Sequence, residues 1–250
     1  MICFFSIILS ASPELRWMQT YGGNDSDYGI EIQPTYDGGY IIIGYTASYS
    51  HGKDDLWILK TDAMGDTIWA QTYGSTEDDR GFAIQQTRDG GYIVTGSMTP
   101  SGAMYDDLWL LKTDESGDTI WTHTYGNDYS DCGKSVQQTS DGGYIITGYT
   151  DINISSESYH NIWLIKTNEI GDTLWTRRYG GAGDMNAHSV QQTYDGGYII
   201  TGYIHPYNTA DKDLWLLKTD AWGNLLWNLR YESLYGTGTD VQQTWDRGYI

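Results

Sequence analysis

The stretch TSDGGYIITGYT, residues 139–150, occurs with few changes at four other places in the chain. The copies are TYDGGYIIIGYT from Thr35, TRDGGYIVTGSM from Thr87, TYDGGYIITGYI from Thr193 and a shortened TWDRGYI from Thr244. Their aspartates, Asp37, Asp89, Asp141, Asp195 and Asp246, follow one another at intervals of 52, 52, 54 and 51 residues. A period near fifty residues is typical of propeller blades rather than of helical solenoids.

Each repeat holds four strand-like runs, represented by KSVQQT, YIITGYT, IWLIKT and DTLWTRRY. The runs are rich in Ile, Val, Thr, Tyr and Trp, as strand propensity requires. The second and third runs are almost wholly apolar, which predicts burial on both faces between neighbouring blades. We therefore expect an all-β chain that forms a β-propeller of four-stranded antiparallel blades.

Tryptophans and glycines recur at fixed places in these runs and turns, and we assign them structural roles. The tryptophans form two series, Trp57, Trp109, Trp163 and Trp215, and Trp69, Trp121, Trp175 and Trp227. The Asp-Gly pairs predict type I′ turns, in which both central residues have positive φ. Their first glycines are Gly38, Gly90, Gly142 and Gly196. A later Gly in the GDT turns predicts a bulge with left-handed backbone.

The combination YGGNDSDYGIEIQPTYDGGYIIIGYT and DLWILKTDAMGDTIW resembles the β-propeller repeat of secreted bacterial and archaeal surface proteins. The resemblance covers residues 17–250 and implies an exported, often multidomain protein with adhesive or scaffolding roles. It also implies that QQT belongs to the innermost strand and TIW to the outermost. The GDTIW ending is similar to blades of quinoprotein dehydrogenases, but no set of quinone-binding or calcium-ligating residues can be matched.

That strand order divides residues 13–250, a single predicted domain, into blades. We expect complete blades at about 28–74, 80–126, 132–180 and 187–231, and a partial fifth at 236–250 with an outer strand at 15–22. The chain is then a fragment of a larger ring, with further domains expected beyond Ile250.

Composition and the N-terminus limit the partners. The chain has 33 acidic residues against 14 Lys and Arg, a formal charge of −19, which disfavours nucleic acids and anionic membrane surfaces. The two cysteines support no disulfide framework. Residues 1–12, MICFFSIILSAS, resemble a signal-peptide core too short to span a membrane; the alternative is a buried N-terminal strand. We therefore expect a secreted, extracellular or cell-surface protein.

The loops between the second and third strands of each unit share little beyond polarity, whereas the DGG and GDT turns on the opposite face barely vary. Loops that differ between repeats are where such a protein can place a binding site. An extracellular glycan or protein is the expected partner, since tyrosine rings can stack on sugars. The candidate ligand-binding residues are Tyr49, His51, Tyr105, Tyr159, His160, His205 and Tyr207. The histidines lie in different blades without a fixed partner, so exposed imidazoles are favoured over zinc ligation.

Acidic residues gather in the connections between blades, where the spacing is compatible with loop calcium sites. The candidates are Asp25, Asp27, Glu77, Asp79, Asp128 and Asp131. None of the connections has the full ligand ladder of an EF-hand, so solvated acidic turns are favoured and no cofactor is expected. Lys60, Lys112, Lys166 and Lys218 share one repeat position, and we expect each to pair with a nearby acid, such as the Asp or Asn two residues on.

Motifs for catalysis are absent from the sequence: it holds no G-x-S-x-G, no H-E-x-x-H and no P-loop. The first hypothesis is a non-catalytic binding or scaffolding module that uses its variable loops. The alternative is the propeller domain of a polysaccharide-active hydrolase, which needs two carboxylates about 5 to 10 Å apart, or of a quinoprotein-like oxidoreductase.

Overall fold

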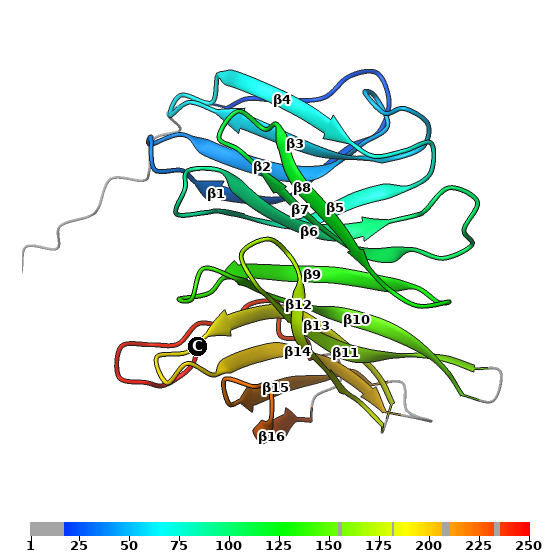
Figure 1. Cartoon of the computed structure of the whole chain (residues 1–250), viewed down its shortest axis with the longest axis vertical. Coiled ribbons are helices and arrows are strands. Elements are labelled where there is room, and N and C mark those ends of the chain that lie inside the picture. Colours follow the sequence, from blue (N-terminus) through cyan, green and yellow to red (C-terminus); the bar gives the residue numbers. More distant parts are fainter. Residues whose placement is uncertain (1–17, 155–156, 182, 207–210, 233–235) are drawn as a thin grey trace, which may run out of the picture.

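Four antiparallel sheets of four strands each make up the computed structural model (Figure 1), which describes residues 18–154, 157–181, 183–206, 211–232 and 236–250. The described residues contain no helix. In every sheet the strands follow chain order, as in a meander. This architecture confirms the predicted β-propeller of four-stranded blades. The segment 1–17, with Trp17 and the signal-like residues, lies outside the described residues.

The sixteen strands are as follows. The first sheet contains β1 (Asp27–Pro34), β2 (Tyr40–Thr46), β3 (Asp55–Thr61) and β4 (Thr67–Tyr73), and the second β5 (Asp79–Gln86), β6 (Tyr92–Met98), β7 (Asp107–Thr113) and β8 (Thr119–Tyr125). The third contains β9 (Asp131–Gln138), β10 (Tyr144–Ile154), β11 (Glu157–Thr167) and β12 (Thr173–Tyr179), and the fourth β13 (Gly183–Gln192), β14 (Tyr198–Pro206), β15 (Asp213–Thr219) and β16 (Leu225–Tyr231).

Three hydrophobic clusters join the sheets face to face, and each combines residues of two neighbouring sheets. Trp109, for example, packs from β7 against Ile43 and Ile58 of the first sheet. Trp57, Trp109, Trp163 and Trp215 are buried, and Trp69, Trp121 and Trp175 are half-buried at the rim of the clusters. Six of these tryptophans therefore pack between two sheets, whereas Trp57 of the first sheet belongs to none of the three clusters.

The DGG turns differ from the predicted type. Gly38, Gly90, Gly142 and Gly196 have φ between 81° and 91°, and Arg247 has the one positive φ among the described non-glycine residues. Asp37 and its equivalents therefore lack the left-handed backbone that a type I′ turn requires, so that prediction is wrong. Instead, Thr35 O accepts the N–H of Gly38, and the Thr35 N–H donates to Gly39 O. This pattern matches a type I turn followed by a left-handed glycine.

The repeated lysines also have a different partner from the predicted one. Lys60 Nζ lies 2.9 Å from Oδ2 of Asp37, in the DGG turn, rather than at Asp62. Lys112, Lys166 and Lys218 contact Asp89, Asp141 and Asp195 in the same way at 3.0 Å. Each ammonium also donates to the carbonyl of the following threonine at 2.8 Å. Strand pairing places the lysine beside the DGG turn, and its stem is buried in the sheet.

Residues before β1 and after β16 repeat contacts that are seen between the four sheets. The Tyr21 hydroxyl donates to Gly65 O, as the Tyr73, Tyr125 and Tyr179 hydroxyls donate to glycine carbonyls of the next sheet. Residues 18–22 nevertheless form no strand. In the fifth unit, a single bridge joins Gln243 and Tyr249, and Tyr249 contacts Trp227 with ring centroids 5.8 Å apart.

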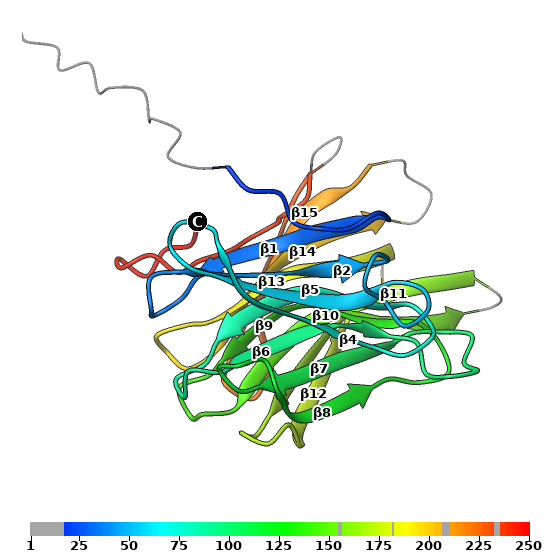
Figure 2. The same cartoon turned by 90° about the horizontal axis from the view of Figure 1, so that it is seen from above.

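Two opposite faces carry the turns (Figures 1 and 2). The turn at residues 244–248 lies on the left of both views, on the side of the DGG turns. The end of the β10–β11 hairpin, from one variable loop, lies on the right. Because each inner strand runs from a connection to a DGG turn, its first residues lie toward the variable-loop face.

Candidate functional site

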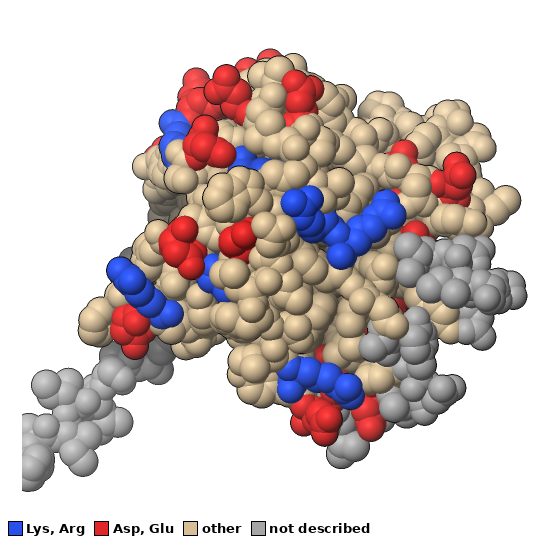
Figure 3. Space-filling view, turned by 60° about the horizontal axis from the view of Figure 1, so that its bottom comes forward, with Lys and Arg blue, Asp and Glu red and all other residues tan. Residues whose placement is uncertain are grey.

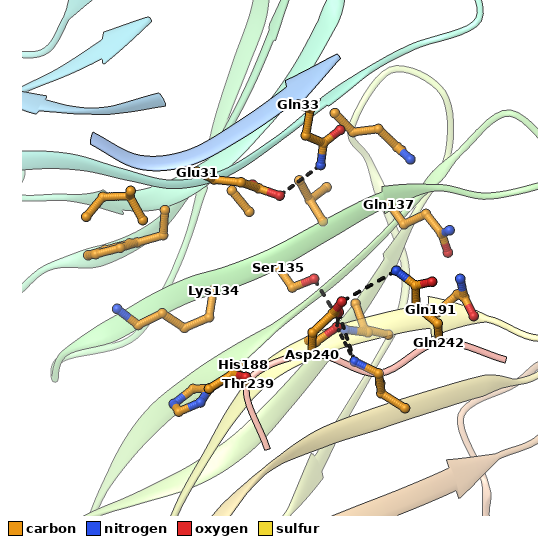
Figure 4. A pocket seen from close by; sticks show the side chains of 18 of the residues that line it. Glu31, Gln33, Lys134, Ser135, Gln137, His188, Gln191, Thr239, Asp240 and Gln242 are labelled. Carbon is orange, nitrogen blue, oxygen red and sulfur yellow. Dashed lines mark hydrogen bonds between the residues drawn. The ribbon is translucent and has the colours of Figure 1, made fainter. Parts of the chain in front are cut away.

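A central cavity of about 530 Å³ lies where the inner strands of the four sheets meet residues 239–242 of the fifth unit (Figure 4). We call it the central cavity and define it by its lining residues from β1, β5, β9, β13 and residues 239–242. Inner strand β9 contacts both β5 and β13, and β5 also contacts β1. The cavity is thus the place where the structure brings together residues from every repeat.

Three layers of side chains line this cavity, one for each inward position of the inner strand. The layer nearest the variable-loop face contains Ile30, Phe82, Lys134, His188 and Thr239. The middle layer contains Glu31, Ala83, Ser135, Ser189 and Asp240. The layer nearest the DGG face contains Gln33, Gln85, Gln137, Gln191 and Gln242. The amide layer is identical in all units, whereas the other two differ in charge and size.

The glutamines also join neighbouring units by hydrogen bonds. Gln85 Oε1 accepts the backbone N–H of Gln138 at 2.6 Å, and Gln137 and Gln191 do the same for Gln192 and Gln243. The second glutamine accepts in the opposite direction: Gln138 Oε1, for example, accepts the N–H of Arg88 at 3.0 Å. The QQT motif therefore lines the cavity and holds the blades together.

Glu31 is the half-buried acid of the middle layer. Its Oε1 accepts a hydrogen bond from Gln33 Nε2 at 2.8 Å, and its Oε2 accepts one from the N–H of Ile84 at 2.9 Å. Burial raises the pKa of the Glu31 carboxyl, the charge of Asp240 raises it further, and the two hydrogen bonds oppose the shift. Ser135 and Ser189 take the same place in other units, where their Oγ atoms accept the N–H groups of Val190 and Val241.

Asp240 is the second acid of the middle layer, and it is exposed to the cavity (Figure 4). The Ser189 hydroxyl donates to its Oδ1 at 2.7 Å, and the N–H of Val241 donates to the same oxygen at 2.8 Å. Within the part of the chain that the structure describes, neither Glu31 nor Asp240 forms an ion pair. The cavity therefore holds two acidic groups without a protein counter-ion.

Lys134 and His188 stand on the other side of the cavity, toward the variable loops. The Lys134 ammonium lies 3.3 Å from the centroid of the Phe82 ring, a cation–π contact. His188 Nδ1 lies 3.1 Å from Gly238 O, and burial lowers the pKa of its imidazole. The cavity thus has an acidic side from the first and fifth units and a basic side from the third and fourth.

Reasoning from the sequence expects the repeated Gln-Thr to line the central channel or to bond across blades, but it missed the charged residues Glu31, Lys134, His188 and Asp240, although a signal was present. The segments GIEIQPT, GFAIQQT, GKSVQQT, AHSVQQT and GTDVQQT vary at the third and second positions before the first Gln, between a Gly or Ala and an Ile or Val. The two positions are consecutive, and a β-bulge at this place in β1, β5, β9 and β13 lets both side chains enter the cavity. Variation confined to the inward face of an innermost strand indicates a site inside the ring.

The predicted tyrosines do not form one site. Tyr49 lines a pocket of about 490 Å³ with Trp57 and residues 20–22, and its hydroxyl donates to Gly22 O. Tyr105 lines a separate pocket of about 250 Å³ with Met104 and Asp128. Tyr159 is half-buried in β11, and Tyr207 lies outside the described residues. Because each loop leaves its own blade, the structure places Tyr49 and Tyr105 in separate pockets.

Two of the predicted histidines have fixed acidic partners, which corrects the expectation that they have none. His51 Nδ1 lies 2.8 Å from Asp55 Oδ2. His160 lies between two carboxylates, with Nε2 2.8 Å from Asp151 and Nδ1 2.9 Å from Asp184 of the next sheet. The hydrogen bond to Asp184 raises the pKa of His160. His205 is half-buried in β14 and also interacts with its surroundings.

The acids of the connections bind the backbone of their own loops. Asp27 Oδ2, Asp79 Oδ2 and Asp131 Oδ2 each accept the N–H of the residue four positions earlier. Burial raises the pKa of Asp131 to about 6. Asp25, Glu77 and Asp128 lie on the surface of the same loops, where Glu77 pairs with Lys53. No group of three or more His, Cys, Asp or Glu is placed for a metal within the described ranges; calcium binding stays untested.

The surface carries both signs of charge. Figure 3 shows one face on which acidic groups and basic groups lie beside each other. In the described part of the chain, no helix is both long and apolar enough to cross a bilayer.

Comparison with known proteins gives distant relatives. No family model matches the chain. It is 21% identical over 174 residues to the regulatory protein FlaEY of Caulobacter vibrioides, a match of 60% of this chain and 18% of that protein. It is 24% identical over 225 residues to an uncharacterised WD repeat-containing protein of Acanthamoeba polyphaga mimivirus, a match of 72% of this chain and 16% of that protein. The chain thus spans less than a fifth of either relative.

Among solved structures, an endo-arabinase of Bacteroides thetaiotaomicron is similar, with a TM-score of 0.47 and 10% identity over 84% of this chain and 82% of that one. That neighbour is an enzyme. This neighbour contradicts the prediction that the chain is not an enzyme, which rested on missing sequence motifs. A likeness at this level assigns no activity to the chain.

Proposed function

We propose that this chain is the carbohydrate-binding propeller of an exported protein and that the central cavity is its binding site. The observation that carries the proposal is the lining of the cavity. Its residues depart from the repeat in the two layers that face the ligand space, while the residues that hold the blades stay constant. Inner strands whose residues change where they enter a cavity can adapt that cavity to a ligand.

The chemistry of the lining supports a polyhydroxylated ligand. Five amides, two serines and two carboxylates offer both donors and acceptors at fixed positions. Phe82 supplies an aromatic ring at the side of the variable loops. The net charge of −19 disfavours polyanionic ligands, so a neutral or cationic glycan fits better than a sulfated one. Tyr105 and the other loop tyrosines then act as outer contacts for a longer chain.

Binding of immobilised and soluble oligosaccharides to the purified chain tests this proposal. We expect saturable binding that falls at least about tenfold when Ser189→Leu places an apolar side chain in the cavity, because a lost hydrogen bond to a charged or polar partner costs about 1.5 kcal/mol. Tyr36→Phe, in an exposed DGG turn outside the cavity lining, is the matched surface control and keeps the affinity. Unchanged affinity in Ser189→Leu, with intact folding by circular dichroism, would place the site elsewhere.

Hydrolysis of the bound glycan is the second candidate, and Glu31 favours it. Its pKa is raised by burial and by the charge of Asp240, so the two acids of one cavity differ in environment. A carboxyl with a raised pKa beside an exposed carboxylate is the pattern of a general acid and its partner. Release of reducing ends that stops in Glu31→Gln, while binding persists, supports this candidate. The absence of release from every bound glycan contradicts it.

A further inference from the structure

The uneven charge of the central cavity carries an inference that rests on the proposed function and narrows its ligand. We infer that the cavity selects a glycan with free amino groups and holds one ammonium group between Glu31 and Asp240. The two acids belong to the first and fifth units, yet they face the same space (Figure 4).

Among the described residues, no cation pairs with either of these acids. The basic residues of the cavity, Lys134 and His188, belong to other units, and Lys134 places its ammonium over Phe82 instead. The hydrogen bonds to Glu31 come from an amide and a backbone N–H, which leave its charge uncompensated. Two like charges in a partly buried site repel each other and favour a cation between them.

An ammonium group suits this place better than a neutral hydroxyl. It has three N–H donors, and each carboxylate still has free lone pairs after its protein hydrogen bonds. Charge-assisted hydrogen bonds are about twice as strong as neutral ones. Lys134, on the far side, repels an ammonium and so orients the ligand with its cationic end toward Glu31.

The rest of the lining points to a sugar rather than to a simple polyamine. The glutamine layer and the two serines surround the acids with neutral donors and acceptors. Those groups match ring hydroxyls and oxygens, which a polyamine lacks. The ligand is therefore an amino sugar that keeps its hydroxyl groups.

Calorimetric titration of the whole chain tests this inference. The probes are a glucosamine tetramer, its fully N-acetylated counterpart and spermidine, each at pH 6 with a chelator present at low and at moderate salt. We expect the glucosamine tetramer to bind about tenfold more tightly than the acetylated one, with a preference that shrinks as salt rises. Glu31→Gln and Asp240→Asn each reduce that preference, while Lys134→Met increases it.

Glu115→Gln is the matched control, because Glu115 lies on an exposed turn far from the cavity lining, and it leaves the preference unchanged. Equal affinity for both tetramers overturns the inference but leaves carbohydrate binding intact. Spermidine that binds as tightly as the glucosamine tetramer also overturns it, because the sugar then adds nothing. The absence of binding to either tetramer contradicts the proposed function itself.

Discussion

At the scale of single residues, the repeat assigns two different environments to the same amino acid. Trp109 is 4% exposed and packs between the first and second sheets, whereas Trp222 is 66% exposed at the tip of a turn. The tryptophan series at regular spacing gave the buried positions in advance. Trp222 stands outside both series, and its exposure follows from its place in a turn.

Substituting Trp109 by alanine should therefore lower the free energy of unfolding by about 3 to 5 kcal/mol, because it removes a large buried ring and leaves a cavity. That loss is a large part of a typical domain stability of about 5 to 15 kcal/mol. Denaturant unfolding of both proteins measures it. Trp222→Ala is the control and should change stability by no more than about 0.5 kcal/mol. Equal effects of the two substitutions would contradict the packing described.

At the scale of elements, the DGG turn is a small polar unit built around one aspartate. Asp37 Oδ1 accepts hydrogen bonds from the Thr35 hydroxyl at 2.6 Å and from the Gly39 N–H at 3.1 Å, and the carboxylate contacts Lys60. The lysine side chain is 5% exposed and the aspartate 57% exposed, so water reaches only one partner. The turn thus provides the charge that a buried lysine requires.

The stability of this turn should depend on pH in a defined window. The Thr35 hydroxyl, followed by Lys60, lowers the pKa of Asp37 from 3.8 to about 2. A lowered pKa means that the ionised form stabilises the folded state above about pH 4 and that this contribution is lost as pH falls toward 2. Asp37→Asn should therefore destabilise the chain at pH 5 to 7, with a difference that shrinks below pH 4.

Thermal unfolding of the parent and of Asp37→Asn across pH 2 to 7 measures this difference. Asp25→Asn, in an exposed connection, is the control and should give a small difference at every pH. A difference between Asp37→Asn and the parent that stays constant down to pH 2 would show that the carboxylate charge is not what stabilises the turn.

At the scale of the whole molecule, the first sheet has one uncovered face. Ile32 of β1 is 56% exposed, whereas Ile84, at the same repeat position in β5, is 1% exposed. Tyr28 of β1 is exposed as well. In the later sheets the residue at the Ile32 position packs against the preceding sheet, as Ile84 does. No described residue covers Ile32 in this way. A contiguous apolar face of this kind favours association.

The chain should therefore self-associate as its concentration rises, and Ile32→Lys should reduce the association. Light scattering over a concentration series measures the effect. Ile68→Lys is the matched control, since Ile68 is 55% exposed on the outer strand β4 and its equivalents are exposed in other sheets. A parent chain that remains monomeric throughout would mean that the face of β1 is not an association surface.

The sequence by itself determined the period, the strands, the glycines of the turns and the buried tryptophans. These features follow from local rules: alternation, strand propensity and the backbone freedom of glycine act within a few residues. The sequence also placed the loop tyrosines on one face, but it could not show that Tyr49 and Tyr105 line separate pockets.

Only the tertiary structure decided which distant residues meet. Glu31 and Asp240 belong to opposite ends of the chain, and the radial packing of four inner strands and residues 239–242 brings them to one cavity. Lys60 reaches Asp37 rather than Asp62 because strand pairing places its side chain beside the DGG turn. His160 meets Asp184 because two sheets stack. Such contacts depend on how units pack against one another, and spacing along the chain does not encode that geometry locally.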